Sequence, residues 1–87
     1  MTRDELTDKF RLALRVNEEL EFKIGSHYWD LGPTSSNRGY KDKKGWVLYQ
    51  FYSDDITYIP SEDSEVIMNI KIEEKTLLEH FVKFELS

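Results

Sequence analysis

The sequence predicts an α+β fold: an N-terminal helix, a four-stranded antiparallel β-meander, and one or two C-terminal helices packed on one sheet face. Residues 2–15 and 75–84 have the three- and four-residue apolar spacing of amphipathic helices. Residues 20–31 alternate apolar and polar side chains symmetrically about Gly25-Ser26, as in a β-hairpin. Because the chain has only 87 residues, we expect a single domain, residues 1–87.

Composition narrows the class of protein. The chain is 39% hydrophobic and 33% charged, which is typical of a globular domain, and it has no apolar run long enough to span a membrane. The absence of cysteine excludes disulfides, thiolate metal sites and cysteine nucleophiles. The acidic, polar start of the chain is unlike a secretory signal. We therefore expect a cytoplasmic protein with no membrane contact.

The N-terminal helix has a start signal and an apolar stripe. Thr2 and Glu5 have the spacing of a capping box, which satisfies backbone N–H groups at a helix start. Asn17 is a plausible residue at which the helix ends. The stripe consists of Leu6, Phe10, Ala13 and Leu14.

The symmetric segment predicts a hairpin with a two-residue turn. Gly25 at the first turn position permits the positive φ of a type II′ turn. This turn places six side chains on one face: Leu20, Phe22, Ile24, His27, Trp29 and Leu31. The opposite face receives Glu21, Lys23, Tyr28 and Asp30. A sheet with one apolar face needs a cover, which the helices would supply.

Residues 32–45 are rich in turn formers and nearly free of apolar side chains, so they predict a long loop. The loop has a net charge of +3, which leaves -8 on the rest of a chain whose net charge is -5. We select as candidate binding residues its basic side chains and the nearby aromatic ones, namely Arg38, Tyr40, Lys41, Lys43, Lys44 and Trp46. A loop that is merely solvated and mobile explains the same composition.

Residues 46–51 and 56–59 predict a second hairpin, and Pro60 ends it because proline has no N–H for the ladder. Alternation puts Trp46 and Leu48 on one face and Val47, Tyr49 and Phe51 on the other. One set must face the helices. The other leaves aromatic side chains, joined by Tyr28 or Tyr58, on an open face, a pattern that indicates protein contacts more often than catalysis.

Residues 61–72 fit two elements. Val66, Met68, Ile70 and Ile72 alternate as in a strand, whereas an N-cap at Ser61 or Ser64 would start a helix. The acidic run Glu62, Asp63 and Glu65 favours a helix N-terminus, although it would also mimic phosphates toward a basic partner.

The run 69–81, Asn-Ile-Lys-Ile-Glu-Glu-Lys-Thr-Leu-Leu-Glu-His-Phe, resembles the tail of small uncharacterised proteins of low-GC Gram-positive bacteria and their phages or mobile elements. In these tails a short helix precedes a Lys-Ile pair, a tight turn that is usually Asp-Gly, and a helix carrying an aromatic residue. Here Glu73-Glu74 replaces Asp-Gly. The resemblance implies a helix over 62–69 and assigns no activity to the chain.

Catalytic signals are weak. His27 and His80 have no ligand spacing to each other, and Asp30 or Glu79 is the nearest candidate carboxylate partner. Asp54-Asp55 falls at an expected turn, where aspartate bonds its own backbone. No glycine-rich phosphate motif or serine nucleophile context is present. We expect no enzyme, no cofactor and no metal site.

Two functions remain. The first is a small, acidic, non-catalytic protein-interaction domain with an unidentified protein partner, of the kind a phage or mobile element carries as an accessory protein. The alternative is a nucleic-acid binding module that uses the basic loop 38–44 and nearby aromatic residues. An open sheet edge also leaves a homodimer as an option.

Overall fold

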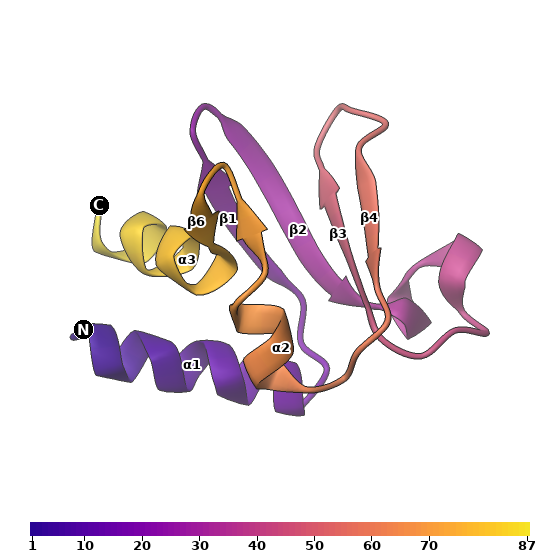
Figure 1. Cartoon of the computed structure of the whole chain (residues 1–87), viewed down its shortest axis with the longest axis horizontal. Coiled ribbons are helices and arrows are strands. Elements are labelled where there is room, and N and C mark those ends of the chain that lie inside the picture. Colours follow the sequence, from indigo (N-terminus) through magenta and orange to yellow (C-terminus); the bar gives the residue numbers. More distant parts are fainter.

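A computed structural model describes all 87 residues and has the expected α+β architecture (Figure 1). The elements in chain order are α1 (Arg3–Arg15), β1 (Leu20–Ile24), β2 (His27–Pro33), the 3-10 turns η1 (Thr34–Ser36) and η2 (Arg38–Tyr40), β3 (Trp46–Gln50), β4 (Ile56–Ile59), α2 (Ser64–Met68), β5 (Lys71–Ile72), β6 (Lys75–Thr76) and α3 (Leu77–Leu86). No helix has both the length and the apolar character that crossing a membrane would require.

The main sheet is an antiparallel meander whose strand order, β1-β2-β3-β4, follows the chain. The first hairpin has the expected register, with Leu20 opposite Leu31 and Ile24 opposite His27. Gly25 has a φ of 62°, as the two-residue turn requires. The second hairpin pairs Trp46 with Ile59. Both predicted hairpins are therefore confirmed.

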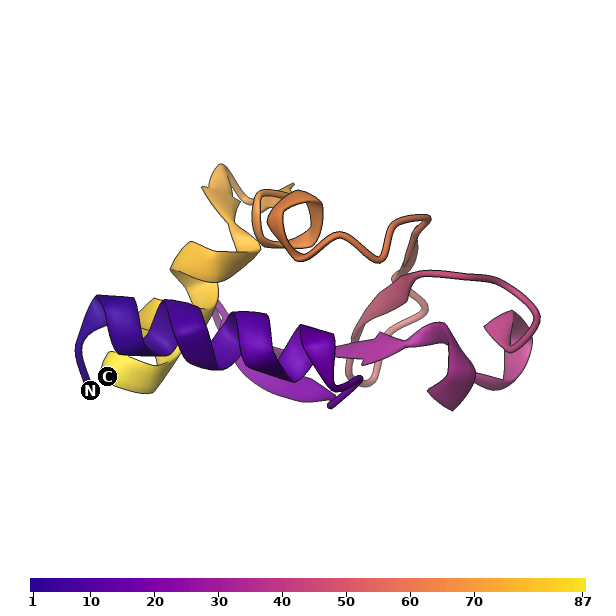
Figure 2. The ribbon, with the colours of Figure 1, turned by 90° about the horizontal axis from the view of Figure 1, so that it is seen from below.

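All three helices pack on one face of this sheet, which we call the inner face (Figures 1 and 2). Phe81 of α3 lies where α1, α3 and β1 meet. Its ring packs edge-on against Phe10 at 5.2 Å and Phe22 at 6.3 Å between ring centroids. The strands contribute to the same core Leu20, Phe22, Ile24, Leu31, Trp46, Leu48 and Ile59.

Both long helices start at a capping box. The hydroxyl of Thr2 accepts from the N–H of Glu5, and that of Thr76 accepts from the N–H of Glu79. The prediction for Thr2 is confirmed, but the start of the last helix is corrected. Lys75 and Thr76 pair with Lys71 and Ile72 in a two-stranded sheet, so α3 begins at Leu77 and not at residue 75.

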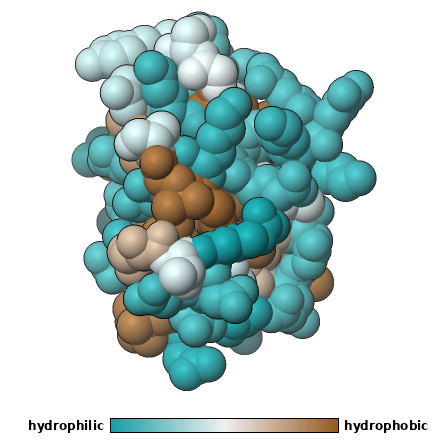
Figure 3. Space-filling model, turned by 90° about the vertical axis from the view of Figure 1, so that its left-hand side faces the viewer, coloured by the Kyte–Doolittle hydropathy of each residue, from teal (hydrophilic) through white to brown (hydrophobic).

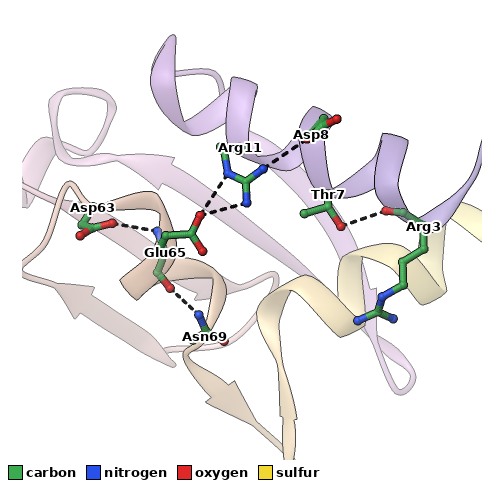
Figure 4. A network of polar contacts seen from close by, with 7 residues as sticks. All are labelled: Arg3, Thr7, Asp8, Arg11, Asp63, Glu65 and Asn69. Atoms are coloured by element: carbon green, nitrogen blue, oxygen red, sulfur yellow. Dashed lines mark hydrogen bonds and ion pairs between the residues drawn. The ribbon is translucent and has the colours of Figure 1, made fainter.

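Residues 64–68 form the short helix α2, which settles the ambiguity in favour of helix. Its N-cap is Asp63 and not either of the two serines considered, because the Asp63 carboxylate accepts from the N–H of Glu65 at 2.9 Å. Glu65 in turn joins α2 to α1, since its Oε1 accepts from Nη2 of Arg11 at 2.9 Å (Figure 4). The acidic run therefore caps and anchors a helix.

The turn between β5 and β6 is made by Glu73 and Glu74, at φ of 52° and 69°. Two successive positive φ values between paired strands define a type I′ turn, which favours Asn-Gly or Asp-Gly. The tight turn is thus present although neither preferred residue is. Each glutamate lies in the left-handed region, which costs a residue with a Cβ about 1–2 kcal/mol.

Candidate binding surface

The segment 34–44 contains the predicted basic loop 38–44, and from here on we call the whole segment the basic loop. It is fixed to the sheet by hydrogen bonds. The Thr34 hydroxyl donates to the carbonyl oxygen of Lys43 at 2.6 Å, and the Tyr58 hydroxyl donates to that of Lys44 at 2.6 Å. The Asn37 amide donates to Pro33 O at 3.0 Å. The predicted loop 32–45 starts later than expected, because Gly32 and Pro33 still pair with β3 as part of β2, and the segment that follows contains the two turns η1 and η2.

Gly45 joins the basic loop to β3 at a position where a larger residue would be strained. Its φ is 131°, and a Cβ at this position would overlap the carbonyl oxygen of Ile59 in β4. The loop therefore returns to the sheet along a path that only glycine can follow without strain.

Tyr40 of the basic loop stacks on Tyr58 of β4, with ring centroids 5.6 Å apart and planes 24° apart. The ammonium group of Lys43 lies 5.7 Å from the centre of the Tyr58 ring. The four cations of the loop are exposed, and none lies within ion-pair distance of a carboxylate: Arg38, Lys41, Lys43 and Lys44. The fold thus brings five of the six predicted site residues together around a stacked aromatic pair.

Trp46 does not belong to this surface. Its side chain is 1% exposed and lies in the core, because position 46 shares the inner face with Leu48. Alternation along the strand had already placed Trp46 and Leu48 on the same face. The sequence therefore contained the evidence that Trp46 is a core residue and not a contact residue.

The opposite face of the sheet, the outer face, has no helix packed across β3 and β4. It carries Tyr49, Phe51, Ile56 and Tyr58. These residues and Tyr40 form what we call the outer aromatic row, in which Ile56 is the one aliphatic member. Val47 is 1% exposed on this face although it lies outside the helical core. Ile56 is 53% exposed, whereas the aromatic side chains of the row are half-buried, so the row is partly open to solvent.

The outer face also holds a buried carboxyl group, which the sequence analysis assigned to this face without expecting burial. Asp30 is 2% exposed, and its Oδ1 has no hydrogen-bond partner. Because Gly32 has no side chain, the side chains of Asp30 and Glu19 can approach its Cα closely. A Cβ there would lie 3.3 Å from Asp30 Oδ2 and 3.2 Å from Glu19 Cγ. Glu19 therefore lies over Gly32 and helps to cover Asp30.

This environment changes two acidities. Burial, followed by the charges of Glu19 and Glu21, raises the pKa of Asp30 to about 7. Burial and the charge of Asp30 raise the pKa of Tyr49, which is the cross-strand neighbour of Asp30. The acidic cluster adjoins the outer aromatic row, so this face is anionic toward β1 and cationic at the basic loop.

The histidines and paired aspartates have separate surroundings. His27 is exposed beside the first turn, whereas His80 is 6% exposed and its Nε2 lies 2.6 Å from Ile72 O. Glu79 is occupied by the cap at Thr76. Asp54 and Asp55 are exposed at a turn in which Ser53, and not an aspartate, accepts the backbone bond.

Carboxylate and imidazole groups do not converge anywhere in a set of three or more with the geometry of a metal site. Comparison with known proteins adds no further assignment, since no family model, curated protein or solved structure matches the chain.

Proposed function

We propose that this chain is a non-catalytic protein-binding domain whose contact surface is the outer aromatic row with the basic loop. The observation that carries the proposal is a row of aromatic and apolar side chains, half-buried except for the exposed Ile56, on a sheet face that the helices leave uncovered. Tyrosine and arginine are enriched among the residues that dominate binding energy in protein interfaces. Tyr49, Tyr58 and Arg38 supply both types here.

Rigidity supports this proposal. The row lies on paired strands, and the basic loop is held to them through Thr34, Asn37 and Tyr58. Side chains that are already ordered lose less conformational entropy on binding than those of a mobile loop. This surface would therefore bind with little rearrangement of the domain.

The charges of the basic loop indicate which kind of protein surface it would bind. The four exposed cations of the basic loop have no intramolecular carboxylate partner, so they favour an acidic patch on the bound protein. The rest of the chain has a net charge of -8 and would repel the same patch elsewhere. Together these charges would select both the partner and its orientation.

A comparison of surface variants tests the proposal. The tagged protein is used to capture partners from lysate after nuclease digestion, and bound proteins are quantified. Ile56→Ser, combined with Tyr49→Ser, should lower recovery of a stoichiometric partner at least about tenfold, as expected for interface residues of high binding energy. Leu12→Ser with Val66→Ser is the control, because these side chains on α1 and α2 are 55% and 50% exposed, about as much as Ile56 at 53%.

Recovery that is equal for both variants would contradict binding through the outer face. The control surface is not the only alternative apolar area, since Met1 and Leu86 are 67% and 57% exposed near the two chain ends. The side of the molecule that carries these ends shows a small apolar patch within a mostly hydrophilic surface (Figure 3). Partner loss on Leu86→Ser alone would relocate the interface to the C-terminal end of α3.

A second candidate function, binding of single-stranded nucleic acid, is favoured by the Tyr40–Tyr58 stack with the Lys43 ammonium group beside it. Aromatic rings stack on bases while lysine and arginine neutralise phosphates. Fluorescence anisotropy with a labelled oligonucleotide should then show salt-dependent binding. Replacing Arg38, Lys41, Lys43 and Lys44 by glutamine should abolish it, and unchanged binding would remove this candidate.

A further inference from the structure

A second polar region, distinct from the outer aromatic row, lies where the turn between β1 and β2 and the turn between β5 and β6 meet the C-terminal end of α3. A cavity of about 310 Å³ opens there. Lys23 comes from β1, Lys75 from β6, and His80, Lys83 and Phe84 from α3. Three separate elements therefore contribute one lysine each to the lining, and the Lys23 ammonium group also lies 5.6 Å from the centre of the Tyr28 ring.

These ammonium groups have no internal counterion at contact distance. The ion pairs of the molecule join Lys9 to Glu85 and Arg11 to Asp8 and Glu65, so none involves a lysine of the cavity. Glu73 is the single carboxylate side chain in the lining. The side chains of the lining thus have a net charge of +2 on a protein whose side chains total -5.

His80 adds an oriented polar atom to the lining. Its Nε2 must carry the proton, because its partner, Ile72 O, can only accept. The other ring nitrogen, Nδ1, makes no hydrogen bond and is not among the buried unpartnered atoms, so it is accessible to solvent.

We infer that this cavity is a binding site for the phosphate group of a small molecule. Convergent ammonium groups without counterions suit a compact dianion, which they hold through charge-assisted hydrogen bonds. Phe84, which packs edge-on against Tyr28 at 6.4 Å, adds an apolar wall for the remainder of a phosphate monoester. The site uses none of the residues of the outer aromatic row or the basic loop.

The inference is tested by titrating the ¹⁵N-labelled protein with inorganic phosphate and, separately, with phenyl phosphate. Sodium chloride keeps the ionic strength constant, because exposed charges are screened by salt. We expect saturable shifts of the amide signals of the cavity residues. The triple variant Lys23→Gln, Lys75→Gln, Lys83→Gln should raise the dissociation constant at least about tenfold, since it removes all three charged donors.

The matched control is Lys41→Gln, Lys43→Gln, Lys44→Gln, which removes the same charge from the basic loop and should change the dissociation constant by less than about twofold. A triple lysine-to-arginine variant of the cavity should retain saturable binding, which separates lost charge from misfolding. Tighter binding of phenyl phosphate than of phosphate would identify monoesters as the class, and equal binding would identify free phosphate. Shifts that do not saturate, or equal losses in the cavity and control variants, would overturn the inference.

Discussion

Asp30 shows how a single residue departs from the strand pattern that contains it. Alternation correctly places it on the outer face, yet Glu19 and the neighbouring strand remove it from water. A carboxylate with an unpartnered oxygen in such a place is costly, so the neutral form is favoured. No spacing rule reveals this, because Glu19 covers Asp30 from outside the strand.

The raised pKa of Asp30 makes stability depend on pH. Below about pH 4 the carboxyl is protonated in both folded and unfolded chains, whereas between pH 4 and 7 only the folded protein retains the proton. The free energy of unfolding should fall as pH rises through this range, by up to about 4 kcal/mol. Asp30→Asn should remove this fall and raise the Tm at pH 8. Thermal unfolding between pH 4 and 8 measures both, with Asp55→Asn as the exposed control.

A wild-type protein whose Tm is the same at pH 5 and pH 8 would contradict the assignment. So would an Asp55→Asn variant that flattens the profile as much as Asp30→Asn.

Gly45 is the other residue whose environment decides a substitution. Because of its positive φ and its contact with Ile59 O, Gly45→Ala should lower the free energy of unfolding by about 2–4 kcal/mol. Urea denaturation measures the change. Gly39→Ala is the matched control, since a Cβ there meets nothing within 4 Å, and it should be neutral or slightly stabilising. Equal effects of the two variants would show that the path of the chain at Gly45 is not constrained.

At the scale of elements, the β5–β6 turn carries strain that the sequence could relieve. Glu73→Asn with Glu74→Gly installs residues that accept positive φ, and it also removes two neighbouring like charges. The double variant should raise the free energy of unfolding by about 1–2 kcal/mol. Denaturation in urea is again the measurement. Glu62→Gly, in an exposed segment without positive φ, should give no gain.

If the double variant is neutral or destabilising, Glu73 and Glu74 make contacts that offset the strain. Glu73 also lines the phosphate cavity, so the same variant should not weaken phosphate binding, because it removes the only carboxylate side chain of the lining.

The long elements were predictable from the sequence because each has several mutually consistent signals. The first helix combines a capping box with a stripe of four apolar residues, and the first hairpin combines a glycine turn with symmetric alternation. The short elements were not, since β5 and β6 have two residues each and offer no period to detect. Lys75 and Thr76 were therefore assigned to the helix that follows them.

The candidate site was predictable only in part for a related reason. Sequence spacing identified the cations of the basic loop and Tyr40, and it named Tyr58 as an aromatic residue of the open face. Their stacking depends on the fold that brings residue 40 over β4. Burial of Asp30 and convergence of Lys23, Lys75 and Lys83 likewise join distant segments.

At the scale of the whole molecule, Phe81 links α1, α3 and the sheet. Phe81→Ala should lower the free energy of unfolding by about 3–5 kcal/mol, because it leaves a cavity between Phe10 and Phe22. Phe51→Ala, on the outer face and only half-buried, should cost clearly less. Calorimetric Tm values compare the two. A smaller loss for Phe81→Ala than for Phe51→Ala would mean that the helices add little to stability.

The strand order of the main sheet has a consequence for how the chain folds. Every strand pairs with its neighbour in sequence, so the meander assembles by closing short loops, each at a small cost in chain entropy. In contrast, the contact between α1 and α3 joins two helices that lie near opposite ends of the sequence. Docking of the first helix onto the last is therefore the step that brings the most distant segments together, and we expect its loss of chain entropy to exceed that of closing any one hairpin.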